Sequence, residues 1–316
     1  MTDYSTLIDA ETWAFIEKTN SFYPPDAVDM TVAEQRAVYD RMCQAFHAGH
    51  PEGLSTGTGW FEYKEPHLRM RVYRPEAENA PAVVLYLHGG GFVVGGLDSH
   101  DDVCAEICAR TGFDVLAVEY RLAPEHQHPA AFDDAFAVFE WLLSRSLPVL
   151  LCGDSAGGNL AAALAAAGQK SERRALGQVL IYPGLGGDVT AGSYVTHANA
   201  PMLSTRDVLY YHDIRGARSD DPTAVPLADA DFSDLPPTVI ITAECDPLSS
   251  DGETYRDRIL AADGKALWIE EKGLVHGYLR ARHSVSRARD SFGRIVEALS
   301  ALGRGEWPAD LARQKP

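Results

Sequence analysis

A short apolar run and an alanine-rich run are joined through the sequence Gly-Asp-Ser-Ala-Gly at residues 153–157. The apolar residues 148–152 suit a buried parallel strand, and the small residues at 160–167 favour a packed helix. So tight a reversal strains the backbone at Ser155, and only glycines at 153 and 157 leave room for the neighbouring chain. We therefore predict that the Ser155 hydroxyl is exposed at the carboxyl edge of a parallel sheet. Because Gly-x-Ser-x-Gly also occurs in ordinary glycine-rich turns, its context must decide.

The rest of the chain alternates runs that predict strands with runs that predict helices. The strands are predicted at residues 68–73, 82–87, 113–118, 147–152, 178–182, 238–242 and 266–269. The helices are predicted at about residues 101–110, 130–144, 160–167, 252–262 and 284–302. Strand followed by helix, repeated, indicates an α/β fold whose mostly parallel sheet is covered on both faces.

Two segments depart from this alternation. Up to about residue 60 we predict short amphipathic helices and, at 53–59, a loop rich in glycine and threonine, with no strand. The run at 68–73 that follows alternates as an exposed edge strand should. Between residues 182 and 235 no strong strand appears, which indicates an inserted lid with a helix at 208–214 that Ser204 caps.

Composition limits the cellular setting and the partners. The 316 residues are 46% hydrophobic and can bury one large core. The formal net charge of −17 argues against nucleic acid as a partner and favours a neutral substrate. Five cysteines without disulfide spacing indicate a reducing compartment, and Cys104 and Cys108 are expected to pack within a helix. Without a signal peptide or an apolar membrane span, we expect a cytoplasmic protein that does not bind membranes, and a homodimer stays open.

Ser155 needs a base within hydrogen-bonding reach and an acid that orients the base. His276 follows the last predicted strand in a glycine-flanked loop, and Asp246 follows the strand before it. Because loops after parallel strands emerge at one edge of the sheet, the three side chains can converge there, and their order along the chain is the hydrolase order. Glu244 and Asp251 are competing acids. We rank Asp246 first because it stands just beyond the strand end.

The sequence His-Gly-Gly-Gly at residues 88–91 follows the buried strand at 82–87. Glycines there let the backbone turn its amides toward a substrate oxygen. The expected oxyanion donors are the amides of Gly90, Gly91 and Ala156. A phosphate loop is the alternative, but the chain has neither Gly-x-x-x-x-Gly-Lys nor Gly-x-Gly-x-x-Gly.

Together these motifs resemble those of the hormone-sensitive lipase family of α/β-hydrolases, and its bacterial carboxylesterases in particular. The segments that carry the resemblance are His-Gly-Gly-Gly-Phe at 88–92, Gly-Asp-Ser-Ala-Gly-Gly-Asn at 153–159, Asp-Pro-Leu at 246–248, His-Gly at 276–277 and Tyr-Arg-Leu-Ala-Pro-Glu-His at 120–126. The resemblance implies an α/β-hydrolase fold with an eight-stranded sheet. It also implies a helical cap, made of residues 1–55 and an insertion at about 185–225, over a catalytic domain of residues 56–316.

The resemblance further implies a serine carboxylesterase that hydrolyses short- to medium-chain acyl esters through Ser155, Asp246 and His276. Its partner is a small-molecule ester, and no metal or organic cofactor is implied. The side chains expected to line the substrate pocket are Phe92, Tyr182, Met202, Leu203 and Tyr211. The same groups serve lactone, amide or carbamate hydrolysis or acyl transfer, and fold alone does not decide. A non-catalytic ligand-binding protein would have a damaged triad, whereas all three residues are present here.

Overall fold

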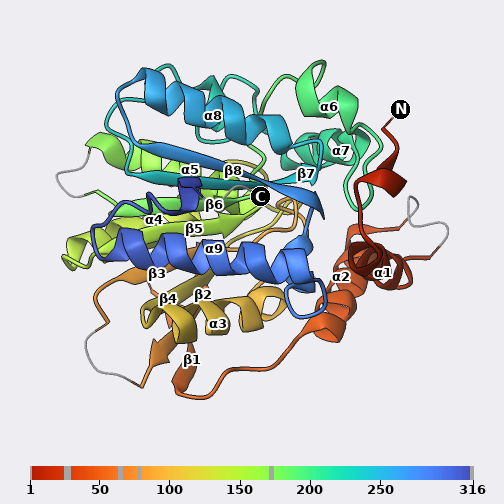
Figure 1. Cartoon of the computed structure of the whole chain (residues 1–316). Helices are drawn as coiled ribbons and strands as arrows, with labels where there is room; N and C mark the ends of the chain where they lie inside the picture. The colour runs from red at the N-terminus through yellow and green to blue at the C-terminus, as the bar shows by residue number, and fades with distance from the viewer. Residues whose placement is uncertain (1, 25–29, 63–66, 77–79, 171–173, 314–316) are drawn as a thin grey trace.

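The computed structural model describes residues 2–24, 30–62, 67–76, 80–170 and 174–313 (Figure 1). Eight strands form one sheet in the order β1-β2-β4-β3-β5-β6-β7-β8. β2 pairs antiparallel with both β1 and β4, and all other neighbours are parallel, so the predicted α/β architecture is confirmed. The strands are β1 Leu54–Phe61, β2 Leu68–Pro75, β3 Val83–Leu87, β4 Asp114–Glu119, β5 Val149–Asp154, β6 Gly177–Ile181, β7 Thr238–Cys245 and β8 Ala266–Val275.

β1 corrects the sequence analysis, which predicted a loop at residues 53–59. Most of its side chains are exposed, so no alternation of apolar and polar residues marks the strand. It forms through backbone pairing with β2 along its whole length, from Leu54 opposite Pro75 to Phe61 opposite Leu68. β2 is therefore an inner strand and not the edge strand that we expected, because β1 occupies the edge.

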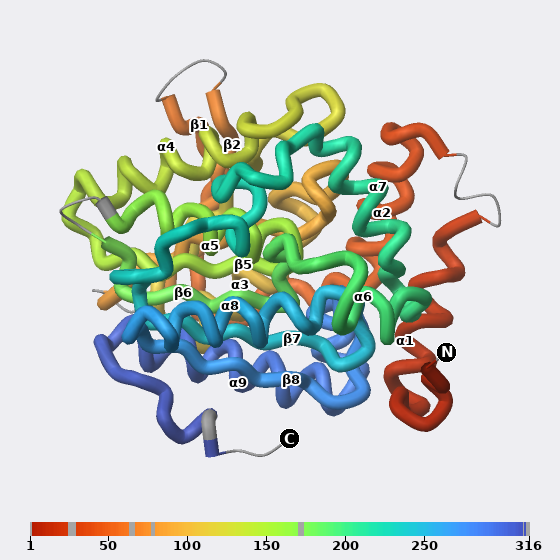
Figure 2. Tube along the Cα trace, turned by 90° about the horizontal axis from the view of Figure 1, so that it is seen from above, coloured from red at the N-terminus to blue at the C-terminus, as the bar shows by residue number. Residues whose placement is uncertain are grey.

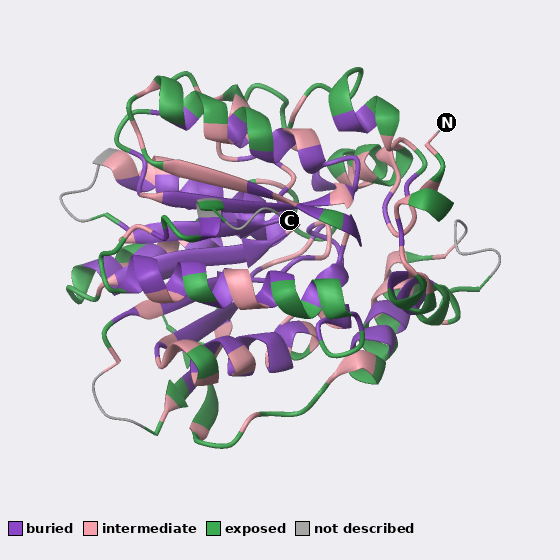
Figure 3. Ribbon diagram, in the orientation of Figure 1, coloured by how far each residue is buried: buried purple, intermediate pink, exposed green. Residues whose placement is uncertain are grey.

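Helices cover both faces of the sheet (Figure 1). One face packs against α3 Asp101–Thr111 and α9 Ser286–Gly303, and the other against α4 Ala130–Ser144, α5 Ala156–Ala167 and α8 Ser249–Ala261. Each face has its own apolar core, and Figure 3 shows the central strands buried between helices whose outer sides are exposed. Short 3₁₀ helices lie at Tyr4–Thr6, Asp98–His100, Gly168–Lys170, Pro226–Ala228, Tyr278–Ala281 and Leu311–Arg313.

Four further helices gather at the end of the molecule where the parallel strands end (Figures 1 and 2). They are α1 Ala10–Asn20, α2 Val32–Phe46, α6 Gly192–Thr196 and α7 Thr205–Arg215. α2 contacts α7 through a hydrogen bond from Gln35 Nε2 to the Tyr210 hydroxyl, 2.8 Å long. Ser204 caps α7 as predicted, because its hydroxyl accepts from the N–H of Asp207 at 3.2 Å. The first strand of the sheet begins at Leu54, two residues before residue 56, where we expected the catalytic domain to begin.

The last two strands are longer than predicted. β7 and β8 continue beyond residues 242 and 269, to Cys245 and Val275, which lie opposite each other in the sheet. Polar residues at 270–272 interrupt the apolar signal of β8, although the backbone pairing continues through 270 and 271. Asp246 and His276 therefore follow directly on two neighbouring strand ends.

The five cysteines are all buried with free thiols. Cys104 and Cys108 pack from α3 into the core, as expected for ordinary helix packing. In the described parts of the chain, every helix is too short or too polar to cross a bilayer.

Candidate active site

Ser155 lies at the turn between β5 and α5, in a strained backbone conformation. Its φ is 53° and its ψ is −116°, a region that residues other than glycine seldom adopt. A Cβ on Gly157 would lie 1.8 Å from the carbonyl oxygen of Leu87, and one on Gly153 would lie 2.7 Å from the same oxygen. Glycines at both positions therefore let β3 pass beside the turn.

The structure brings Ser155, His276 and Asp246 together from three separate strand ends. His276 Nε2 lies 2.9 Å from Ser155 Oγ, and His276 Nδ1 lies 2.7 Å from Asp246 Oδ2. Asp246 is completely buried, and its Oδ1 accepts from the N–H of Leu248 at 2.9 Å. At these distances an imidazole can take a hydroxyl proton on one nitrogen while a carboxylate orients the other.

The competing acids lie elsewhere. Asp251, in the first turn of α8 as predicted, accepts through Oδ2 from the backbone N–H groups of residues 185 and 186, at 2.7 and 3.0 Å. Glu244 accepts through Oε2 from a backbone N–H of β8 at 2.8 Å. Both carboxylates therefore fix the backbone of neighbouring segments. Of the three candidate acids, Asp246 is the one hydrogen-bonded to His276.

The amides expected to receive an oxyanion line the same cavity as Ser155. Gly90 and Gly91 have φ values of 124° and 59°, and among the described residues their N–H groups have no acceptor. Ala156 is the first residue of α5, where an N–H has no partner within the helix. All three N–H groups are therefore free to bind a ligand oxygen.

Asp154, which precedes Ser155, was not among the predicted site residues, yet it anchors them. It is 3% exposed, and its Oδ1 accepts from the Tyr86 hydroxyl at 2.8 Å and from the N–H of Gly89 at 3.0 Å. His100 Nε2 lies 3.3 Å from the same oxygen. Burial raises the pKa of Asp154, but the charge and hydrogen bond of His100 and the bond from Tyr86 outweigh it and lower that pKa to about 2.

A cavity of about 800 Å³ borders Ser155 and His276. The five expected wall residues are all in its lining: Phe92, Tyr182, Met202, Leu203 and Tyr211. Tyr182 packs against His276, with ring centroids 4.9 Å apart. Tyr211 of α7 covers Gly91, where an added Cβ would lie 2.6 Å from the tyrosine ring. The segment at 185–225 thus supplies part of the wall.

Several polar lining residues were not predicted from the sequence, and three of them come from different parts of the chain. Tyr39 comes from α2, Arg215 from the end of α7, and Arg280 from the 3₁₀ helix after His276. Nothing in the local sequence separates a pocket arginine from one on the surface. The short distance along the chain between Arg280 and His276 was the one available signal.

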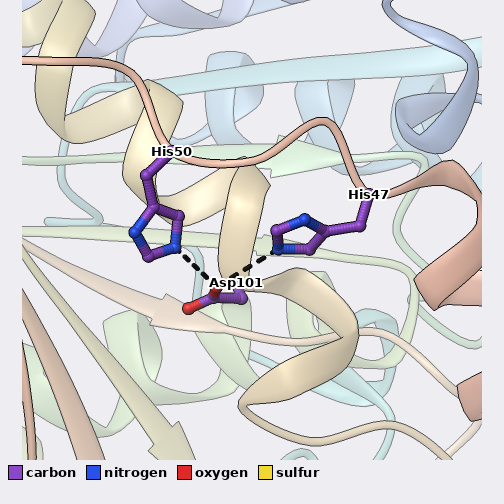
Figure 4. Close-up of side chains that lie close together, drawn as sticks. All are labelled: His47, His50 and Asp101. Atoms are coloured by element: carbon purple, nitrogen blue, oxygen red, sulfur yellow. Dashed lines mark hydrogen bonds and ion pairs between the residues drawn. The ribbon is translucent and has the colours of Figure 1, made fainter.

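One group of metal-ligand types lies outside the cavity (Figure 4). Among the described residues, His47, His50 and Asp101 bring ligand atoms within 4.8 Å of one another. The N–H of Gly49 donates to His47 Nδ1 at 3.0 Å, so the ring proton is on Nε2, which faces Asp101 Oδ2 at 3.2 Å. A protonated ring nitrogen cannot ligate a metal. The other oxygen of Asp101 accepts from Arg71 Nη1 at 2.7 Å. Hydrogen bonds between the segment after α2 and the start of α3 therefore account for this cluster.

Known proteins resemble the chain over most of its length. Residues 84–280 match the family model described as the alpha/beta hydrolase fold. Carboxylesterase NlhH of Mycobacterium tuberculosis is 37% identical over 251 residues, 73% of this chain and 77% of that protein. Ethyl acetate hydrolase of Pseudomonas putida is 33% identical over 249 residues, 73% of this chain and 78% of that protein. An esterase of Pyrobaculum calidifontis superposes with a TM-score of 0.81 at 30% identity, covering 87% of this chain and 94% of that one.

Proposed function

We propose that this chain, which belongs to the hormone-sensitive lipase family of α/β-hydrolases and is a carboxylic ester hydrolase, cleaves short- to medium-chain acyl esters by attack of Ser155. One observation supports the proposal. The ring of His276 is hydrogen-bonded to Ser155 Oγ at 2.9 Å and to Asp246 at 2.7 Å, and Ser155 and His276 line the cavity. A serine hydroxyl becomes a nucleophile at neutral pH when such a base is at hand.

In the acylation step, His276 Nε2 takes the hydroxyl proton as Ser155 Oγ forms its bond to the ester carbonyl carbon. The buried carboxylate of Asp246 holds the Nδ1–H and stabilises the imidazolium. The carbonyl π electrons move onto oxygen, and the tetrahedral oxyanion accepts from the N–H groups of Gly90, Gly91 and Ala156. Removing one such donor typically raises the barrier by about 2.7–4 kcal/mol.

Collapse of this intermediate breaks the bond to the alcohol oxygen, which takes the proton from His276 and leaves. The acyl group stays on Ser155 Oγ. Water then attacks the acyl carbon with His276 as the base, and collapse of the second intermediate returns the proton to Ser155 and releases the acid.

We assign α1, α2 and the segment at 185–225 to a cap over this site. Tyr39 and Met42 from α2 and Tyr211 from α7 line the cavity. A pocket of about 800 Å³ with mostly apolar walls lies within the range of small-molecule sites. It has room for a short or medium acyl chain. The names of the Pseudomonas and Mycobacterium relatives describe ester hydrolases, which supports the same substrate class.

Hydrolysis of p-nitrophenyl esters of increasing acyl length tests the proposal. We expect a maximum rate at short to medium chains, and a fluorophosphonate probe is expected to label Ser155, as mass spectrometry would show. Ser155→Ala is expected to lower kcat by about 10⁴- to 10⁶-fold with an unchanged circular dichroism spectrum. The matched control is Ser144→Ala, because that hydroxyl is exposed and donates to the carbonyl of Trp141 in its own helix. Equal rates in Ser155→Ala and the wild type would remove Ser155 from the mechanism.

A further inference from the structure

Away from the cavity, arginines with little exposed surface are paired with carboxylates. Arg282, whose side chain is 2% exposed, bonds to Asp102 at 2.7 Å. Arg294, whose side chain is 19% exposed, pairs with the buried carboxylate of Glu271. Taking a charged group out of water costs several kcal/mol unless an opposite charge and hydrogen bonds compensate it. An arginine that is largely removed from solvent and has no such partner therefore requires an explanation.

Arg280 lacks such a partner, although its side chain is only partly exposed and its Nε is buried. It lines the cavity four residues after His276, and among the described residues no carboxylate lies within ion-pair distance of it. Its Nη1 donates to the hydroxyl of Tyr39 at 3.2 Å, whereas its Nε is buried without an acceptor. Most N–H groups of this guanidinium are thus unused by the protein.

The groups that face Arg280 are uncharged at neutral pH. Burial raises the pKa of the Tyr39 and Tyr182 phenols well above their ordinary value, and it raises the pKa of the Cys43 thiol to about 11. The phenol of Tyr23 likewise has a raised pKa because of burial. The charge of Arg280 also acts on Asp154, but hydrogen bonds from other groups already occupy that carboxylate.

A second cation lines the same cavity. Arg215 is 7% exposed, its guanidinium lies 3.6 Å from the centre of the Phe92 ring, and its Nη1 donates to the carbonyl of Ala224 at 2.9 Å. Its Nη2 is buried and has no partner within the described parts of the chain. Burial lowers the pKa of Arg215 to about 9, so it stays charged at neutral pH. Among the described residues, neither of the two arginines with little solvent exposure in the cavity wall, Arg215 and Arg280, has a carboxylate partner, although the formal net charge of the chain is −17. The third arginine of the lining, Arg206, is exposed.

We propose that the ester cleaved at this site also carries a carboxylate, and that Arg280 binds that carboxylate. The inference rests on the proposed role of Ser155. A guanidinium presents N–H donors in a fork that matches the two oxygens of a carboxylate, and such charge-assisted pairs are the stronger hydrogen bonds. The substrate would supply the counter-ion that the fold omits. This differs from the neutral substrate expected from net charge, because an average over the chain does not describe the cavity.

Two pairs of matched substrates test the proposal on the wild-type protein. Mono-(p-nitrophenyl) adipate against p-nitrophenyl hexanoate places the carboxylate on the acyl half, and 4-acetoxybenzoate against 4-acetoxybenzamide places it on the alcohol half. We expect kcat/KM to be about tenfold or more higher for the anionic member of at least one pair. No preference for either anionic ester would overturn the proposal. Hydrolysis of the neutral esters with a labelled Ser155 would leave the proposed function standing, whereas no hydrolysis of any ester would refute the proposed function itself.

Substitutions then assign the preference to a residue. Arg280→Gln is expected to abolish the preference, mainly by raising KM for the anionic ester, and to change the neutral ester less. Arg280→Lys keeps the charge and is expected to restore part of the preference for the anionic ester. It also tests the role of Arg280 if Arg280→Gln fails to fold. Arg218→Gln is the matched control, because Arg218 is exposed and pairs with Asp220. A preference that survives Arg280→Gln but disappears in Arg215→Gln would overturn the assignment to Arg280.

Discussion

Asp154 Oδ1 accepts a hydrogen bond from the backbone N–H of Gly89, 3.0 Å long, and this bond ties the turn that carries Ser155 to the glycine loop after β3. A Cβ on Gly89 would lie 2.3 Å from Asp154 Oδ2, so a larger residue has no room there. The distance between Ser155 Oγ and the amides of Gly90 and Gly91 therefore depends on the hydrogen bond that the Asp154 carboxylate accepts from Gly89.

Asp154→Asn tests this dependence. The variant keeps the size of the side chain and one oxygen that can accept from Gly89, but it loses the charge that attracts His100. We expect kcat for p-nitrophenyl butyrate to fall by about 10- to 100-fold, because a small misplacement of reacting groups has effects of this size. KM should change less. Steady-state kinetics measure both, with the exposed Asp220→Asn as the control, and an unchanged kcat in Asp154→Asn would contradict the positioning role.

The orienting acid can be identified by comparing Asp246→Asn with Asp251→Asn. Asp246 bonds to His276, whereas Asp251 bonds to the backbone of residues 185 and 186. We expect kcat to fall by about 10⁴-fold in Asp246→Asn, because the imidazole loses the group that sets its tautomer. In Asp251→Asn the fall should stay below about tenfold, since the effect passes only through the cap segment. The reverse order of the two losses would make Asp251 the acid.

Parallel topology explains why the sequence alone could place Ser155, Asp246 and His276 in one site, although they lie far apart in the chain. Asp246 and His276 follow two neighbouring parallel strands, and Ser155 follows a third, so all three must lie at one edge of the sheet. Their mutual distances depend on where each strand ends. The apolar runs placed the ends of β7 and β8 too early, because backbone pairing continues through polar residues such as Glu271.

The features that sequence did not predict depend on contacts between distant segments. β1 forms because its backbone pairs with β2. Its exposed side chains, glycine and threonine among them, show no alternation from which a strand could be predicted. The surroundings of Arg280 are Tyr39 from α2 and Tyr182 after β6. Neither the position of this guanidinium in the cavity wall nor its lack of a carboxylate partner among the described residues could be inferred until those elements were placed.

A glycine at the turn can be tested against a glycine in a helix. At Gly157 a Cβ would lie 1.8 Å from the carbonyl oxygen of Leu87, which is backbone and cannot move aside. We expect Gly157→Ala to lower the free energy of unfolding by about 3 kcal/mol, at the upper end for an overpacked site. At Gly293 in α9 the nearest atom would be 3.8 Å away, so Gly293→Ala should raise that free energy by about 0.5–1 kcal/mol. Urea titrations measure both changes, and equal midpoints for the two variants would contradict the close approach at the turn.

His88, which opens the glycine loop, makes the stability of the protein depend on pH. Its Nδ1 lies 2.8 Å from the carbonyl oxygen of Gly89, so Nδ1–H donates there. Its Nε2 is buried and has no partner among the residues that the structure describes. Protonation would place a charge and an unsatisfied donor in the core. The ring of His100 also stacks on it at 5.8 Å. Burial first, and the charge of His100 second, lower the pKa of His88 to about 4.

Because the folded state lowers this pKa below the unfolded value of about 6.5, the neutral imidazole contributes stability that is complete above pH 6.5 and is lost as pH falls toward 4. Between pH 7.5 and pH 5.0 the loss from this one group is about 2 kcal/mol. His88→Asn keeps a side-chain donor for Gly89 but does not titrate, so its free energy of unfolding should fall by about 2 kcal/mol less than that of the wild type over this range. Urea unfolding at the two pH values measures the difference, with the exposed His126→Asn expected to follow the wild type. If His88→Asn and the wild type lost equal stability, the buried imidazole would not be the group that titrates.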